Sequence, residues 1–494
     1  MPLKRISWRS CFVLFVVVVG AIISALFYKQ IMHTLVDDHK NATLQQVKTK
    51  QELRVGMLRS LTKFYVDYRN PNQVGGFDHA LLKNFADHLG VKLTVIFANN
   101  TDELIAKFNE DKIDLISAEL QASALESNPF VMSNSYHLYS QQLVYRKGST
   151  KPYSIDQITG TLMVPKNSTQ SHILGLLKNE APNLNWQESS VFNQEELLKL
   201  VEDQTIDYTI ADEQTVTIMQ RIYPMLTVAF NVIDDQPKAW YFHDLYDDSL
   251  LKEANQFIND AISNGTVKNL EQRYFSYMDR FDYVDTRAFI RAIDTTLPKY
   301  RPFFEKYAKK NDLDWKFIAA MAYQESHWNP KAVSTTGVRG IMMLTKSTAE
   351  SMGVTNRLNA EQSIKGGTAY IKQIIKRIPN TVPKEERVWF ALAGYNMGLG
   401  HLWDARKLAS EQGLNPDSWH DVRQVLPLLS EEEYYSQLKY GFARGFQASH
   451  FVDSVQQYYM SLVGYLLEKE HRHKHMQEKQ QTLSPTTDTI SLIK

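Results

Sequence analysis

Cysteine is almost absent from this chain of 494 residues, since Cys11 is the only one. A disulfide framework, a thiolate zinc site and a cysteine nucleophile in the globular part are therefore excluded. A net charge is absent too, because 55 Lys and Arg balance 55 Asp and Glu, and no long block of like charge suggests a nucleic-acid partner. With 43% hydrophobic residues the chain is neither disordered nor fibrous, and its length fits about three domains.

One long apolar run is present near the N-terminus. Residues 11–28 carry no charge and follow Lys4, Arg5 and Arg9. The run is intermediate in length between a secretion signal and a full membrane span, and the basic residues favour a cytoplasmic N-terminus. Residues 1–32 are therefore predicted to be either a cleaved signal peptide or a retained membrane anchor, followed by a polar spacer over residues 33–50. The rest of the protein is expected outside the cytoplasm.

The segment from residue 51 to residue 280 alternates short apolar runs with amphipathic helical patterns, which is typical of an α/β domain. Gly90 follows a helical repeat and is expected to cap that helix. Two such halves predict one bilobal α/β domain. The expected strands lie at 52–58, 91–97, 112–120, 141–148 and 161–168, and the clearest helices at 79–90 and 194–204.

From residue 281 to residue 470 the strand-like runs vanish and helical periodicity dominates, so this second domain is predicted to be all-α. The remaining residues, 471–494, form a polar tail whose end is expected to be disordered. No cofactor and no metal site is indicated anywhere in the chain. The fold class is thus multidomain, with an α/β bilobal domain followed by an all-α domain.

A helix is predicted from Asp314, a plausible N-cap, to the break at Asn329-Pro330. Its residues Ile318, Ala322 and Glu325 share one face, which places a carboxylate on an apolar stripe near the helix C-terminus. Partial desolvation and the negative end of the helix dipole both favour the protonated acid there. Glu325 is therefore a candidate general acid; the alternative is that it points into solvent, as most helical glutamates do.

Two further segments could contribute to a site around Glu325. Gly337 and Gly340 bound a tight turn just after this helix, where backbone groups can approach a ligand closely. Tyr395 and Asn396 come before a glycine in a later helix, where an aromatic face and an amide could contact a polar, ring-shaped substrate.

Taken together, these residues resemble the soluble-lytic-transglycosylase branch of the lysozyme fold. The order Glu325-Ser326, then the GxxGxMxL turn at 337–344, then Gly394-Tyr395-Asn396 matches the motifs of that family. The resemblance is closest to the F type of membrane-bound lytic murein transglycosylases, which also carry an N-terminal solute-binding-like domain. It implies cleavage of the β-1,4 bond between N-acetylmuramic acid and N-acetylglucosamine in peptidoglycan glycan strands during cell-wall turnover. It also implies a periplasmic protein associated peripherally with the outer membrane, although a retained inner-membrane anchor stays open.

The sequence offers no convincing second carboxylate close to these motifs, whereas ordinary glycosidases need two. A lytic transglycosylase needs only one, because the muramyl 6-hydroxyl replaces water as the nucleophile and a 1,6-anhydro end results. The resemblance implies that Glu325 supplies and then reclaims the proton. It also implies that Ser326 makes a hydrogen bond near Glu325 or the substrate and that Tyr395 and Asn396 shape the subsites.

Two positions depart from the family pattern. Met343 stands where the family usually has glutamine in the turn, and Phe451 stands where it often has a tyrosine that approaches the glutamate; Tyr440 is a possible substitute. Both Met343 and Phe451 are expected at the substrate site. These departures keep a second hypothesis open, namely a cell-wall sensor that binds glycan or muropeptide without cutting it. A water-using muramidase is a third.

The α/β domain resembles family 3 of the bacterial extracellular solute-binding proteins, through the order of its strand and helix patterns. In amino-acid-binding members an arginine clamps the ligand carboxylate, but an ungapped alignment places Glu126 at that position. The acidic partner of the ligand amine is kept as Asp212, which could equally be a helix cap. A muropeptide or another small amine-bearing ligand is therefore expected, and its binding could regulate the attached enzyme.

Overall fold

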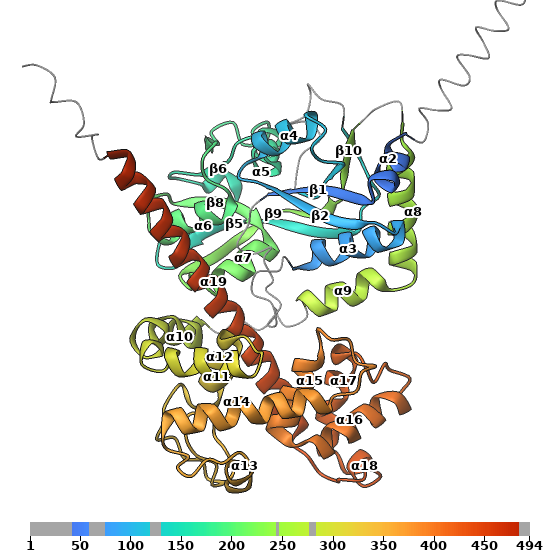
Figure 1. The fold of residues 1–494 in the computed structure, drawn as a ribbon. Helices are drawn as coiled ribbons and strands as arrows, with labels where there is room; N and C mark the ends of the chain where they lie inside the picture. The colour runs from blue at the N-terminus through green and yellow to red at the C-terminus, as the bar shows by residue number, and fades with distance from the viewer. Residues whose placement is uncertain (1–41, 59–74, 119–129, 244–246, 276–282, 484–494) are drawn as a thin grey trace, which may run out of the picture.

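The computed structural model describes residues 42–58, 75–118, 130–243, 247–275 and 283–483. The predicted signal or anchor at 1–32 lies outside these residues. Within them, no helix is both long and apolar enough to cross a bilayer. An α/β domain stacks on a helical domain, and one long helix, α19, runs alongside both (Figure 1).

The first lobe of the α/β domain is built on a five-stranded sheet of order β2-β1-β3-β10-β4. β1 pairs in parallel with β2 and β3, whereas β10 is antiparallel to β3 and β4. Its elements are α2 (Ala42–Lys50), β1 (Glu52–Leu58), α3 (Phe77–Leu89), β2 (Lys92–Ala98), α4 (Thr101–Asn109), β3 (Leu115–Ile116), β4 (Phe130–Met132), β10 (Tyr241–His243), α8 (Ser249–Ser263) and α9 (Thr266–Phe275).

The second lobe contains a three-stranded antiparallel sheet, β8-β5-β9, and a parallel pair, β6-β7. The chain enters this lobe at the start of β5 and leaves it at the end of β9. The two crossing segments lie side by side, because the backbone N–H of Tyr136 donates to the carbonyl of Lys238 at 3.0 Å. A buried ion pair of 2.9 Å joins Lys238 to Asp78 of the first lobe. The elements are β5 (His137–Arg146), η2 (Ile155–Gln157), β6 (Met163–Pro165), α5 (Thr169–Leu177), β7 (Gln187–Ser189), α6 (Gln194–Glu202), β8 (Tyr208–Asp212), α7 (Glu213–Gln220) and β9 (Leu226–Lys238).

Local signals in the sequence explain several of these elements. α3 ends at Gly90, which has φ 71° and caps the helix in the left-handed conformation as predicted. α6 begins with a capping box between Asn193 and Glu196. The expected spacer at 33–50 differs, because its second half is α2, whose Val47 is 2% exposed in the core of the first lobe. Burial of that side chain makes α2 part of the domain.

The second domain is helical, as predicted, and encloses a single large apolar cluster. α12 lies at its centre and packs against both α11 and α19. Its elements are α10 (Tyr283–Thr295), η3 (Leu297–Lys299), α11 (Arg301–Lys310), α12 (Trp315–Ser326), α13 (Lys346–Ser351), α14 (Ala360–Arg377), α15 (Arg387–Met397), α16 (Leu399–Glu411), α17 (Trp419–Val425), η4 (Leu426–Ser430), α18 (Glu432–Tyr435) and α19 (Gly445–Leu483).

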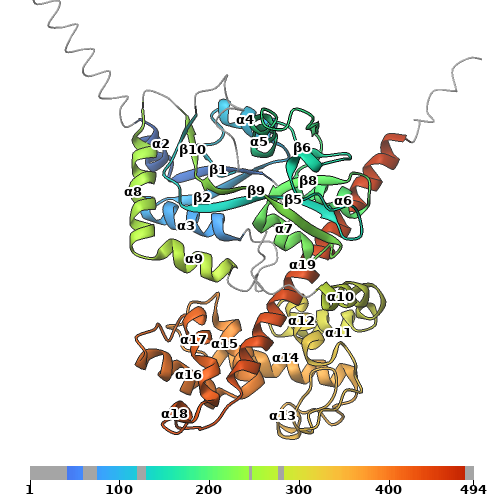
Figure 2. The ribbon, with the colours of Figure 1, turned by 180° about the vertical axis from the view of Figure 1, so that it is seen from behind.

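Helix α19 connects the helical domain to the second lobe, and both views show it passing from one to the other (Figures 1 and 2). Gly464 packs so closely on Ile222 that an added Cβ would lie 2.6 Å from its Cδ1. Tyr465 contacts the apolar clusters of both the helical domain and the second lobe. The helix continues to Leu483, so the backbone of the expected polar tail begins as helix.

The first lobe has its own attachment to the helical domain. Arg273 of α9 forms an ion pair of 2.8 Å with Glu386, just before α15. The other carboxylate oxygen of Glu386 accepts a 2.6 Å hydrogen bond from the backbone N–H of Trp419. Each lobe of the α/β domain therefore contacts the helical domain through different residues.

Candidate active site

The helix that carries Glu325 begins as predicted but ends earlier. Asp314 caps α12 and accepts a 2.9 Å hydrogen bond from the backbone N–H of Lys316. The helix stops at Ser326 because His327 and Trp328 have φ of 51° and 57°, so the left-handed backbone breaks it before Asn329-Pro330 is reached. The indole of Trp328 is 1% exposed and donates to the carbonyl of Ala319 at 2.8 Å, which holds the reversed chain against the helix.

Glu325 lies in the last turn of α12 and is partly buried. Among the described residues, no hydrogen bond or ion pair to its carboxyl group is found. Burial raises the pKa of Glu325 from its ordinary value to about 8, and no cationic neighbour offsets that effect. The alternative of a solvent-directed glutamate is therefore not what the structure shows. At neutral pH this carboxyl group holds a proton.

The turn after α12 requires both of its glycines. Gly337 and Gly340 have φ of 84° and 86°, a conformation that side chains with a Cβ disfavour. A Cβ on Gly340 would also lie 1.9 Å from the carbonyl oxygen of Arg357, whereas one on Gly337 would meet open space. The guanidinium of Arg357 donates to the carbonyls of Gly337 and Leu344 at 3.0 and 2.9 Å, and so fixes both ends of the turn.

Two hydroxyl groups hold this turn against the helices. Ser326 donates to the carbonyl of Ile341 at 2.9 Å, and Tyr395 donates to the carbonyl of Met342 at 2.8 Å. The pKa of Tyr395 is raised well above its usual value by burial and then by the negative charge of Glu325, so these two groups are electrostatic neighbours. In this arrangement, both hydroxyls bind backbone carbonyls of the turn.

The remaining predicted residues differ in exposure. Asn396 is exposed beside Tyr395, and Met343 is partly exposed in the turn with φ 44°. Phe451 is 5% exposed and belongs to the apolar core, so the expectation that it faces substrate finds no support in its placement. The role of Arg357 was not predicted, because the residue follows the turn in an otherwise unremarked loop and its partners are backbone carbonyls.

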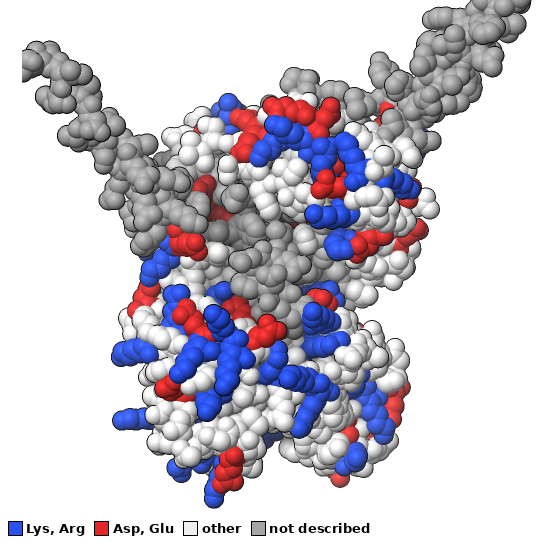
Figure 3. Space-filling model, in the orientation of Figure 1, with Lys and Arg blue, Asp and Glu red and all other residues white. Residues whose placement is uncertain are grey.

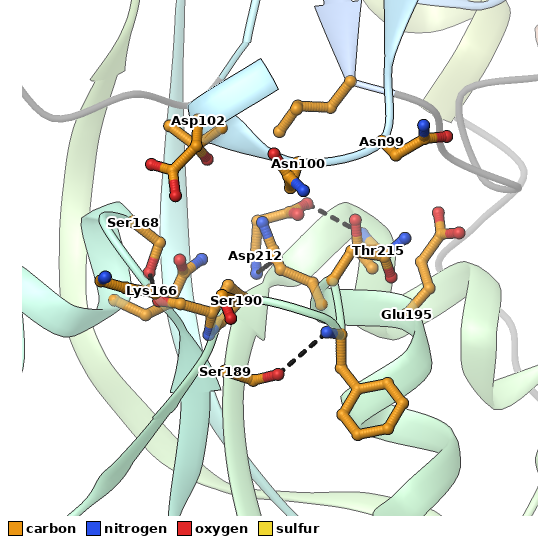
Figure 4. A pocket seen from close by; sticks show the side chains of 17 residues that line it. Asn99, Asn100, Asp102, Lys166, Ser168, Ser189, Ser190, Glu195, Asp212 and Thr215 are labelled. Carbon is orange, nitrogen blue, oxygen red and sulfur yellow. Dashed lines mark hydrogen bonds between the residues drawn. The ribbon is translucent and has the colours of Figure 1, made fainter. Parts of the chain in front are cut away.

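A pocket separates the two lobes of the α/β domain, and Asp212 lines it (Figure 4). The carboxylate of Asp212 is 3% exposed and accepts a 2.8 Å hydrogen bond from the backbone N–H of Thr215, as the cap of α7. Asp212 therefore serves as a cap and also contributes to the pocket. Glu126, the other predicted ligand residue, lies outside the described residues.

The lobes meet over this pocket. The amide of Asn167 in the second lobe donates to the carboxylate of Asp102 in the first lobe at 2.9 Å. Glu195 adds a buried carboxylate to the lining, and Lys166 adds an ammonium group. The pocket is partly open to solvent, and the volume within it that water-sized molecules can occupy is about 70 Å³, room for a few water molecules.

Gly340→Ala should destabilise the helical domain by at least about 3 kcal/mol, because the new methyl group would collide with a backbone carbonyl at a positive φ. Gly337→Ala is the matched control, since it has the same φ but open space, and should cost about 1 kcal/mol. Urea unfolding followed by circular dichroism measures both. Equal losses for the two variants would contradict the steric explanation.

Glu325→Gln should stabilise the protein increasingly as pH rises from about 4.5 to about 8. The folded pKa is raised above the unfolded value, so in this pH range the parent chain must take up a proton on folding, and its stability falls by at most about 1.4 kcal/mol per pH unit, whereas glutamine stays neutral. Unfolding in urea at several pH values measures the difference. Glu350→Gln, at an exposed glutamate on α13, is the control. A difference between Glu325→Gln and parent that is independent of pH would contradict the burial of this acid.

Solved structures similar to this chain include a mutant of ArgBP from T. maritima, at 21% identity and a TM-score of 0.41, covering 47% of this chain and 99% of that one. An ancestral arginine-binding protein bound to arginine is similar at 19% identity and a TM-score of 0.40, covering 46% of this chain and 98% of that one.

Two family models and many curated relatives match the chain. Residues 53–277 match the bacterial extracellular solute-binding proteins, family 3, and residues 302–417 match the transglycosylase SLT domain. The membrane-bound lytic murein transglycosylase F of Pectobacterium atrosepticum is 46% identical over 87% of this chain and 89% of its own length. That of Serratia proteamaculans is 45% identical over 87% of each. The chain therefore belongs to the family of membrane-bound lytic murein transglycosylase F and is an enzyme of that class, with a solute-binding-like α/β domain before its helical SLT domain.

Proposed function

We propose that this enzyme cleaves the β-1,4 bond between N-acetylmuramic acid and N-acetylglucosamine and leaves a 1,6-anhydromuramic acid end. Glu325 is its single acid and base. The observation that carries this proposal is a partly buried carboxyl group whose pKa is raised to about 8, with no cationic partner among the described residues. Family membership supports peptidoglycan cleavage in general, and the environment of Glu325 supports this particular chemistry.

The proton of Glu325 is used twice. At neutral pH the acid is protonated and can donate to the glycosidic oxygen as the bond to the muramyl carbon breaks. The carboxylate that remains is desolvated and lies near the positive charge that develops on the sugar ring. It then removes the proton of the muramyl 6-hydroxyl, whose oxygen attacks the same carbon and closes the anhydro ring. Glu325 ends protonated and no water is consumed.

The other site residues have positioning and contact roles in this proposal. Ser326 and Tyr395 keep the turn at 337–344 seated on α12 and α15, which supports a fixed wall beside Glu325. Met343 and Asn396 are accessible enough to contact the glycan. Gly337 and Gly340 allow the backbone of the turn to approach it. Phe451 contributes through the core.

The water-using alternative has less support. A retaining or inverting glycosidase needs a second carboxylate near the acid. Burial is the cause of the raised pKa of Glu325, and no second carboxylate in the described part of the chain contributes to it. The sensor alternative rests on the departures from the family pattern at Met343 and Phe451. Phe451 is buried, so its departure gives no reason to expect that the bond is left uncut.

The surface charge supports an acidic polymer as the substrate. The face of the helical domain that carries α11 and α14 presents many Lys and Arg side chains (Figure 3). Exposed residues of these helices include Lys309, Lys310, Lys365, Lys376 and Arg377. The stem peptides of peptidoglycan carry carboxylates, so a basic face favours binding even though the whole chain has no net charge.

We further propose that the enzyme acts in cell-wall turnover in the periplasm, peripherally at the outer membrane, with residues 1–32 as its signal or anchor. The solute-binding-like domain is assigned to 51–280 and the catalytic domain to 281–470. The pocket between the lobes binds a muropeptide or another amine-bearing ligand, because among the described residues the carboxylates of Asp102, Glu195 and Asp212 line it against one ammonium group, that of Lys166. Lobe movement on binding would regulate catalysis through the separate attachments of the two lobes.

Glu325→Gln should reduce turnover of purified cell walls by at least about a thousandfold, because glutamine keeps the shape but cannot donate the proton. Mass spectrometry of the soluble products should show 1,6-anhydro ends from the parent enzyme and none from the variant, and Glu350→Gln should behave as the parent. Reducing ends from the parent would indicate a muramidase. An absence of products from the parent would favour the sensor.

Asp212→Asn should preserve the cap of α7 but weaken binding of an amine-bearing ligand by about tenfold or more, because asparagine caps as well as aspartate and carries no charge. Titration calorimetry with muropeptides released from purified peptidoglycan measures the affinity, and thermal unfolding reports the cap. Asp212→Ala should lose both. Unchanged affinity in Asp212→Asn would reduce this residue to a structural cap.

A further inference from the structure

Three aromatic side chains stand exposed in the segment between α18 and the first turn of α19. Tyr440 is 47% exposed, Phe442 54% and Phe446 56%. Phenylalanine is normally buried, and most of the large aromatic side chains of the helical domain lie in its core. A concentration of exposed rings in one short segment is typical of a surface that binds something.

The backbone that carries these rings is fixed. The N–H of Tyr440 donates to the nearly buried carboxylate of Asp404 at 2.8 Å, and the N–H of Ala443 donates to the carbonyl of Leu429 at 3.0 Å. Gly445 packs against the carbonyl of Leu426, where an added Cβ would lie 1.7 Å from the oxygen. The rings are thus presented on a tightly packed segment and lose little freedom when they bind a ligand.

Contacts connect this segment to the residues around Glu325. The ring of Tyr440 lies on Gly400, where a Cβ would meet it at 2.7 Å, in the first turn of α16. α16 directly follows α15, which ends with Tyr395 and the exposed Asn396. Tyr395 is the electrostatic neighbour of Glu325. Tyr440 is thus connected to the region of Glu325 through the adjoining ends of α15 and α16.

The chemistry of the segment fits a glycan strand that carries acidic peptides. The C–H faces of sugar rings pack on aromatic faces, and these rings offer such faces. Lys439 and Arg444 flank them, with the ammonium group of Lys439 5.3 Å from the ring centre of Tyr440. Both cations can meet the carboxylates of stem peptides. The exposed acids Glu431, Glu432 and Glu433 are confined to the start of this region, at α18.

Aromatic rings with flanking cations could also contact a membrane surface. The placement favours the glycan, because α18 lies at one end of the molecule and α2, the first described element after the apolar N-terminal run, lies at the other (Figures 1 and 2). A membrane attachment through the N-terminal run would therefore join the molecule at the end that is remote from these rings.

We propose that Tyr440, Phe442 and Phe446 form an aromatic shelf that holds the peptidoglycan strand beyond the bond that is cleaved. This proposal rests on the proposed function, since it extends the binding site of Glu325. The shelf determines affinity for long strands, and the bond-breaking chemistry remains with Glu325.

Binding to purified insoluble peptidoglycan tests the shelf, in the full chain with Glu325→Gln so that nothing is cut. Phe442→Ala and Phe446→Ala should each weaken binding about fivefold, and together about tenfold or more, because each removes a stacking face. Phe442→Tyr keeps the ring and should restore affinity. Tyr153→Ala is the matched control, as its ring is 74% exposed on the α/β domain, and should leave binding unchanged. Unfolding temperatures of these variants equal to that of the parent would exclude misfolding as the cause of weaker binding.

Two results would overturn the shelf. One is peptidoglycan binding of the double variant within twofold of the parent. The other is loss of binding to vesicles of phosphatidylethanolamine and phosphatidylglycerol with peptidoglycan binding intact, which would assign the rings to a membrane.

In the active chain, the double variant should raise KM for long strands about tenfold and change kcat less than twofold. If that chain releases no anhydro products while the binding loss persists, the proposed catalytic function fails and the shelf stands.

Discussion

The site depends on one unfavourable arrangement, a carboxyl group partly withdrawn from water at the end of a helix, with no cation among the described residues to compensate it. Burial alone raises the pKa of Glu325 to about 8. The helix dipole acts in the same direction, because the last carbonyls of α12 are close to it. Nothing local would keep such a side chain in place, since a glutamate at a helix terminus can usually rotate into solvent. Its burial must therefore be imposed by the surrounding structure.

The turn at 337–344 and the reversed chain at His327 and Trp328 are the structures that adjoin the end of α12. The left-handed residues end α12 abruptly, and the buried indole of Trp328 fixes the direction in which the chain leaves. The turn then returns to the same helix and is held there by the hydroxyls of Ser326 and Tyr395. All of these bonds terminate on backbone carbonyls, so the side chains around the end of α12 hold main chain in place. Strain is thus concentrated around the acid and is offset by the apolar core below it.

Much of this could be predicted from the sequence, where the signal is local. The change from alternating runs to helical periodicity separated the domains, and Asp314, Gly90 and the paired glycines each mark a helix end or turn through their own backbone preferences. Other features have no local signal. The partner of Tyr395 is a carbonyl more than fifty residues away, and the clamp by Arg357 depends on a loop that only the fold brings close. Burial of Phe451 and exposure of Phe442 are likewise set by packing, because the two residues are chemically the same.

Helix α19 gives the α/β domain a physical route to the acid. It packs against α12 within the helical core and, further along, places Gly464 and Tyr465 against the second lobe. The first lobe is attached elsewhere, through Arg273 and Glu386. The two attachments lie on different lobes. If the lobes part to admit a ligand, either the distance between the two attachments changes or one of the two contacts breaks. A rigid helix transmits such a displacement along its length, to α10 through Asp294 and to α12 through the helical core. Catalysis and ligand binding can be coupled here only to the extent that the packing of α12 on α19 differs between the two lobe arrangements.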